Sequence, residues 1–219
     1  MITLLGTNHV SPRSIHLVTN AVEDYDITAI ELDKYRLEKL FSTPQKPSFF
    51  QLAKVVGVSG AVFAIIGNYV EHKIGAQVST MPGDEMRAAI KEAAIAKKKI
   101  ALIDQPIHIT LQRFSKAFTL KVKWKLLKML FKKTPIRMSP HSVPDQETIQ
   151  QIVDLLDTHI PELSAVLIHE RNTYMADALE KLQEKNPEET ILAVIGAGHL
   201  PGISEALKNK NIKIAIHEQ

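Results

Sequence analysis

Short apolar runs rich in β-branched residues alternate with amphipathic segments, and this alternation most restricts the fold. Runs of four to eight such residues are typical of strands buried on both faces of a parallel sheet. The segments between them have helical periodicity; residues 84–98, for example, have acids in the first turn and lysines in the last. We therefore predict an α/β fold with a largely parallel central sheet flanked by helices. The predicted strands are residues 2–5, 27–32, 99–103, 165–169, 191–195 and 212–216.

Two segments interrupt the alternation, at about 48–74 and 111–133, and we predict that both are helical insertions. No Gly/Ser-rich linker divides the 219 residues, and a chain of this length can form one large domain. We thus expect a single domain over residues 1–219. The apolar run at 52–70 has an uncharged part shorter than the roughly 20 residues of a bilayer-spanning helix, so a buried or surface helix is expected there.

The pattern Gly-x-x-His occurs twice, each time after a predicted strand: TLLGTNHVSP at 3–12 and AVIGAGHLPG at 193–202. Ligands of open parallel sheets bind at the carboxyl ends of the strands. We therefore expect His9 and His199 to face each other at that edge. Charged residues follow the other predicted strands and should reach the same edge. They are Glu31, Asp33, Asp104, Glu170 and Arg171.

Imidazole and carboxylate groups at one edge of a sheet permit two chemistries. Two histidines with one or two acids can hold a divalent transition metal, which lowers the pKa of a bound water. Alternatively, one histidine acts as a general base oriented by a carboxylate, without a metal. The spacing does not separate these alternatives. A single histidine after a strand is more often an ordinary turn residue, but two matched copies favour a site.

Six motifs follow one another along the chain from about residue 3 to residue 205: GTNHVS, IELDKYR, PGDEMRAAI, LIDQPIHITLQR, ERNTYMADAL and VIGAGHLPGI. Together they resemble the TraB/PrgY family of pheromone-shutdown proteins. The paired Gly-x-x-His motifs are also similar, more distantly, to Tiki proteases, ChaN-like proteins and erythromycin esterases. The TraB/PrgY resemblance implies inactivation or sequestration of a peptide signal, and the Tiki resemblance implies metal-dependent peptide hydrolysis.

This resemblance also implies roles for individual residues. His9, His199 and Glu31 match the two histidines and the glutamate of the Tiki motifs, so they are the predicted ligands of Mn, Co or Zn. Glutamates at motif positions are predicted to carry protons or support the metal, and arginines to hold a substrate carboxylate or an oxyanion. The predicted catalytic residues are Glu31, Glu85, Glu170, Arg36 and Arg171. The predicted substrate-binding residues are Arg87, Arg113 and Asn172.

The resulting hypothesis is a metal-dependent hydrolase of a peptide or amide bond, which would inactivate a peptide signal. Two alternatives stay open: a non-catalytic protein that binds a peptide signal, and a scaffold at a membrane surface. The segment 111–133 combines lysines with aromatic and leucine residues. Such a segment can pack on the sheet with its lysines in solvent, form a homo-oligomer contact, or lie on an anionic membrane.

The composition of the chain limits the kinds of partner and the cellular compartment that are expected. The net charge is only +3, and no motif that reads a nucleic-acid groove is present, so a nucleic-acid partner is not expected. The chain has no cysteine, which excludes disulfides and cysteine-based zinc sites and fits a reducing cytoplasm. Many members of the family continue into a C-terminal membrane region. Membrane association is therefore expected if the full-length protein has one.

Overall fold

The computed structural model describes residues 1–7, 12–42, 83–131 and 146–217. Its centre is a five-stranded sheet in the order β3-β2-β4-β1-β5, in which all neighbouring strands are parallel. This confirms the predicted fold class, and each of these strands was predicted to within two residues at either end. The strands are β1 (Ile2–Thr7), β2 (Ile27–Ile30), β3 (Lys99–Leu102), β4 (Ile191–Gly196) and β5 (Ile214–Ile216).

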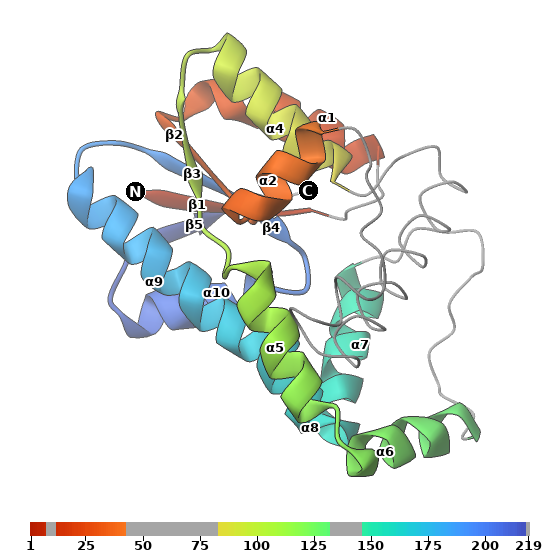
Figure 1. Cartoon of the computed structure of the whole chain (residues 1–219). Helices are drawn as coiled ribbons and strands as arrows, with labels where there is room; N and C mark the ends of the chain where they lie inside the picture. The colour runs from red at the N-terminus through yellow and green to blue at the C-terminus, as the bar shows by residue number, and fades with distance from the viewer. Residues whose placement is uncertain (8–11, 43–82, 132–145, 218–219) are drawn as a thin grey trace.

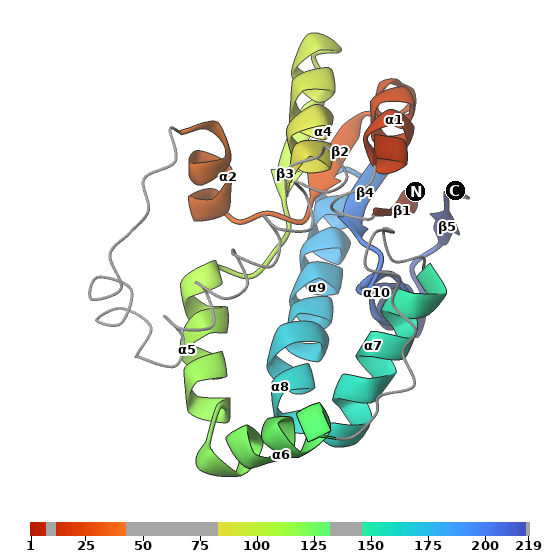
Figure 2. The same cartoon turned by 90° about the vertical axis from the view of Figure 1, so that its right-hand side faces the viewer.

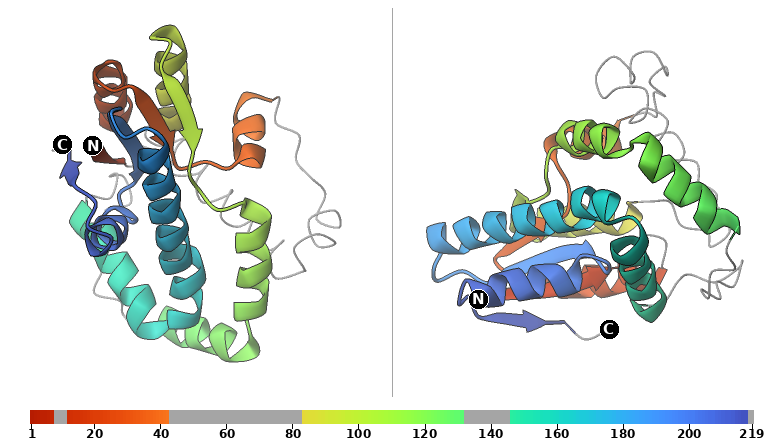
Figure 3. Two further views of the ribbon diagram at one scale, coloured as in Figure 1. Left: turned by 90° about the vertical axis from the view of Figure 1, so that its left-hand side faces the viewer. Right: turned by 90° about the horizontal axis from the view of Figure 1, so that it is seen from below.

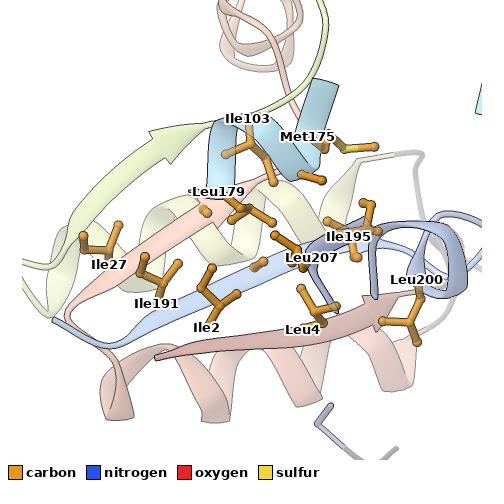
Figure 4. Close-up of a cluster of buried hydrophobic side chains, with 14 residues drawn as sticks. Ile2, Leu4, Ile27, Ile103, Met175, Leu179, Ile191, Ile195, Leu200 and Leu207 are labelled. Carbon is orange, nitrogen blue, oxygen red and sulfur yellow. The ribbon is translucent and has the colours of Figure 1, made fainter. Parts of the chain in front are cut away.

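Helices cover both faces of the sheet (Figure 1). On one face, α1 (Pro12–Ala21), the 3-10 turn η1 (Val22–Asp24) and α4 (Asp84–Ile95) pack on strand residues such as Leu5 and Val194. On the other face, α9 (Glu170–Lys185) and α10 (Leu200–Asn209) pack on residues such as Leu4 and Ile195, as Figure 4 shows. Because side chains alternate along a strand, adjacent residues of β1 and β4 supply the two clusters.

Further helices extend beyond the sheet (Figures 2 and 3). Phe114, Val122, Ile160, Leu163 and Val166 form a separate buried cluster that holds this extension together. The predicted insertion at 111–133 is thus helical where the structure describes it, although its first helix begins four residues earlier. The insertion at about 48–74 lies outside the described residues. The helices of the extension are α5 (Ile107–Ala117), α6 (Leu120–Phe131), α7 (Gln146–His159), α8 (Pro161–Ser164) and the π-helical turn η2 (Ala165–His169).

The predicted strand at 165–169 is wrong, because this segment is the π-helical turn η2 between α8 and α9. Ile160, Leu163 and Val166 are spaced by three and all contribute to the cluster with Phe114, which is the pattern of a helix face. A short apolar run cannot be assigned to strand or helix by periodicity alone. The helix preceding it begins with Pro161 in its first turn, where proline is well tolerated.

The two strands that precede the Gly-x-x-His motifs are neighbours in the sheet. In the parallel register of β1 and β4, Gly6 pairs with Ile195 and Thr7 pairs with Gly196. A Cβ at Gly6 would lie 3.1 Å from Cδ2 of Leu200, so glycine allows the start of α10 to pack closely on β1. The opposite ends of the chain therefore meet at the centre of the sheet.

Among the residues described, no helix combines the length and the apolar character required to cross a bilayer.

Candidate functional site

The guanidinium of Arg171, in the first turn of α9, lies at the centre of a buried cluster of polar side chains. It donates to Oε1 of Glu31, which follows β2, and to Nε2 of His199, which follows β4, the latter from Nη1 at 2.8 Å. It also donates to both carboxylate oxygens of Asp104, which follows β3, at 3.1 Å and 2.5 Å. A longer bond of 3.4 Å joins Nη1 to the carbonyl oxygen of Leu167. One guanidinium thus connects residues from the carboxyl ends of three strands, the edge at which the sequence predicts a site.

The electrostatics of this cluster depend on the carboxylates around Arg171. The side chain of Asp104 is fully buried and that of Glu31 is 4% exposed. Burial alone would lower the pKa of the Arg171 guanidinium, but the carboxylates of Glu31 and Asp104 outweigh that effect and raise the pKa above its ordinary value. Arg171 is therefore permanently charged, and its positive charge compensates the two buried carboxylates.

A second arginine extends the cluster toward solvent. Arg36 in α2 (Lys34–Phe41) donates to Oδ2 of Asp104 and, from Nε at 3.1 Å, to Oδ2 of Asp33. Asp33 is the N-cap of α2, since its Oδ1 accepts from the backbone N–H of Arg36 at 2.9 Å. Its Oδ2 also accepts from the N–H of Ile107, the first residue of α5, at 2.6 Å. One aspartate thus fixes the starts of two helices beside the cluster.

The imidazole of His199 has a defined orientation and tautomer. Because arginine can only donate hydrogen bonds, Nε2 of His199 accepts from Arg171 and the ring hydrogen is on Nδ1. Nδ1 then donates to Oδ1 of Asn172 at 2.7 Å. Glu31 is fixed in a similar way, because its Oε2 accepts from the N–H of Gly196 at 2.6 Å. Nε2 of His199 and Oε1 of Glu31 lie 3.4 Å apart.

Gly202 in α10 makes room for the asparagine that orients His199. A Cβ built at Gly202 would overlap the side-chain amide nitrogen of Asn172 and lie 3.0 Å from its Cγ. Any larger residue at this position must therefore displace Asn172. The sequence contains one signal for this role, because a glycine inside a helix is unfavourable and usually has a packing reason.

Several other predicted site residues lie in different surroundings. Arg113 of α5 pairs with Glu170 of α9, Nη1 to Oε2 at 2.6 Å, and both side chains are partly exposed. Arg87 of α4 donates from Nη2 to the carbonyl oxygen of Leu40 in α2 at 2.9 Å. Glu85 is 1% exposed in the first turn of α4. The structure brings together Glu31, Arg36, Arg171, Asn172 and His199.

The sequence predicts a divalent metal at this edge, and the distance between His199 and Glu31 bears on whether these residues can hold one. Two ligand atoms bound to one tetrahedral ion at about 2.0–2.2 Å are about 3.3–3.6 Å apart, which matches the 3.4 Å between His199 and Glu31. The residues described contain no group of three or more His, Asp or Glu side chains arranged to hold an ion. His9, the other predicted histidine ligand, lies outside the described residues. The described residues thus offer one pair of atoms at the spacing of two metal ligands, and each atom of the pair accepts a hydrogen bond from Arg171.

From the sequence, Asp104 is only one of the charged residues expected at this edge, whereas the structure places it between both arginines. Its position after a strand was the available signal. The contribution of Asp33 as a cap for two helices was missed. The signal for it was an aspartate immediately before an amphipathic segment.

These features define a class of protein: a parallel α/β domain with a buried, arginine-centred charged site at the carboxyl ends of its strands. The sequence model of the TraB/PrgY/gumN family matches residues 1–215. The chain belongs to the TraB/PrgY/gumN family.

Two curated proteins illustrate this relationship. An uncharacterized protein of Methanocaldococcus jannaschii is 32% identical over 216 residues, which cover 94% of this chain and 53% of that protein. A TraB domain-containing protein of Bos taurus is 25% identical over 230 residues, covering 92% of this chain and 61% of that protein. This chain therefore spans between half and two thirds of the length of these relatives.

Proposed function

We propose that the chain is a metal-dependent hydrolase of a peptide or amide bond, and that His199 and Glu31 bind a divalent Mn, Co or Zn ion. The observation that supports this most directly is the 3.4 Å separation of Nε2 of His199 from Oε1 of Glu31. A second hydrogen bond orients each side chain. Nδ1 of His199 donates to Asn172, and Oε2 of Glu31 accepts from the N–H of Gly196. Such supporting bonds are typical of metal-ligating residues because they fix the tautomer and the direction of the lone pair.

His9 is proposed as a further ligand because its motif follows β1, the neighbour of β4. When bound, a divalent ion polarises a carbonyl and lowers the pKa of a water molecule. Within the protein, Arg171 is held by Asp104 through Nε and Nη2, so Nη1 can exchange His199 for a substrate oxygen. Arg36, whose side chain is 27% exposed, is the guanidinium closer to solvent and would hold a substrate carboxylate.

The first test is metal binding by isothermal titration calorimetry with Mn, Co and Zn salts. We expect His199→Ala to lower the affinity for the tightest-bound ion by more than about 100-fold. Removing a residue that only orients a metal ligand typically lowers the affinity by about 10–100-fold. His108→Ala is the matched control, because His108 is an exposed histidine in α5. Equal affinity in the His199→Ala variant and the wild type would rule out the metal site.

The second test separates hydrolysis from binding. The wild-type protein is incubated with a peptide library in the presence and absence of a chelator, and the products are identified by mass spectrometry. Cleavage that stops on chelation and is absent in the His199→Ala variant is the expected result. Retention of intact peptides without cleavage would instead support the alternative, a protein that binds a peptide signal without hydrolysing it.

A further inference from the structure

Helix α6 combines exposed apolar residues with an unbalanced positive charge. Its sequence, LKVKWKLLKMLF, contains four lysines and no acidic residue. Leu120 is 74% exposed and Trp124 is 62% exposed. Because residues four apart lie on the same side of a helix, these two side chains form one exposed apolar stripe. Exposed apolar groups of this kind often mark a surface that binds a partner.

The opposite side of α6 is occupied by the protein itself. Val122 is fully buried in the cluster with Phe114, and Leu126 packs against the same cluster. Lys125 on this side is held by Glu162, with Nζ at 2.7 Å and 2.8 Å from the two carboxylate oxygens. The inner face therefore anchors α6, and the orientation of the outer face is fixed by packing.

Lysines border the Leu120–Trp124 stripe on both sides. At 100° per residue, Lys121 and Lys128 lie to one side of the stripe and Lys123 to the other. All three are exposed, and the ammonium group of Lys123 lies 5.4 Å from the ring centre of Phe118. The views agree that α6 lies at the end of the helical extension farthest from the sheet (Figures 1 and 2).

We infer that the outer face of α6 binds the surface of an anionic lipid bilayer. Trp124 and Leu120 would enter the interface, while the lysine stems lie along it and their ammonium groups meet the headgroups. A second copy of this chain is less suitable, because docking of two α6 faces would place lysines opposite lysines with no acid from either helix. The inference does not depend on hydrolase activity or on metal binding.

Trp124 is the only tryptophan of the chain, so its fluorescence reports directly on this face. The full chain is titrated with vesicles of phosphatidylcholine alone and of phosphatidylcholine mixed with phosphatidylglycerol, and co-sedimentation is measured in parallel. We expect a blue shift and co-sedimentation with the mixed vesicles, both reduced at high salt because salt screens the lysines. Vesicles of phosphatidylcholine alone should produce little of either.

Charge reversal provides the variants. Lys121→Glu/Lys123→Glu/Lys128→Glu should weaken partitioning into the mixed vesicles by about 100-fold or more, since each lysine contributes near an anionic surface. The matched control is Lys91→Glu/Lys181→Glu/Lys208→Glu, which makes the same change at exposed lysines of α4, α9 and α10 and should retain most of the binding. Far-UV circular dichroism establishes that both variants are folded.

Three results would overturn the inference. Absence of both the blue shift and co-sedimentation would show that α6 does not bind lipid. Equal weakening in the two triple variants would show that only net charge matters. Concentration-dependent self-association that Trp124→Ser abolishes, without vesicle binding by the wild type, would assign the face to a second copy of the chain.

Discussion

Replacement of Arg171 by methionine is expected to lower the free energy of unfolding by about 3–5 kcal/mol, the loss typical of breaking a buried ion pair on one side. Methionine can occupy part of the space, but it removes the guanidinium that makes one contact with Glu31 and two with Asp104, and Asp104 then keeps only Arg36 as a guanidinium partner. The measurement is urea denaturation followed by far-UV circular dichroism, at fixed pH and salt.

Arg113→Met is the matched control for this change. Arg113 also forms an ion pair with a glutamate, but both side chains are partly exposed, so the expected loss is only about 0–1 kcal/mol. A similarly small loss for Arg171→Met would mean that Glu31 and Asp104 are compensated by other groups. If His199 and Glu31 bind an ion as proposed, added Mn or Zn should restore stability to the Arg171→Met variant by mass action. The same addition should not rescue a double variant that also carries His199→Ala.

Most of the sheet could be predicted because its three inner strands, β2, β4 and β1, are buried on both faces. Their sequences are therefore short, continuous apolar runs, and the burial of β1 and β4 is complete along their length. The segment from 165 to 169 has the same composition, but its neighbours decide its structure. Phe114 and Val122, which come from α5 and α6, provide the surface on which Val166 packs as part of a helix face. That surface is not visible in the local sequence.

The site residues that follow strands could be predicted from the sequence, whereas the contacts made by residues on helices could not. Glu31 follows β2 and His199 follows β4. These two strands are parallel and pair directly with each other, so the two residues reach the same edge of the sheet. Arg171 was expected at the end of a strand, yet it reaches the same edge from the first turn of α9. The contacts of Arg36 and Arg171 with Asp104 depend on how α2 and α9 pack, which no local pattern specifies.

The contact between Gly202 and Asn172 was equally hidden, and it leads to a second large expected effect. Gly202→Ala should displace Asn172, because the new Cβ would overlap its amide. Alanine favours a helix by about 1 kcal/mol relative to glycine, but overpacking typically costs about 1–3 kcal/mol. Displacement also removes the bond that orients His199. If the proposed metal site is correct, metal affinity should fall by about 10–100-fold, measured by isothermal titration calorimetry.

Gly198→Ala is the control for this substitution. It lies in the same motif, but its Cβ would be 3.4 Å from Cγ2 of Ile149, an ordinary van der Waals contact, so Asn172 should keep its position. A double-mutant cycle then tests the cause directly. Asn172→Ala removes the amide that the new methyl group meets, so Gly202→Ala should add little further loss of metal affinity in that background. An equal loss in both backgrounds would show that Gly202 acts through some other contact of α10, and that Asn172 is not the link between this glycine and His199.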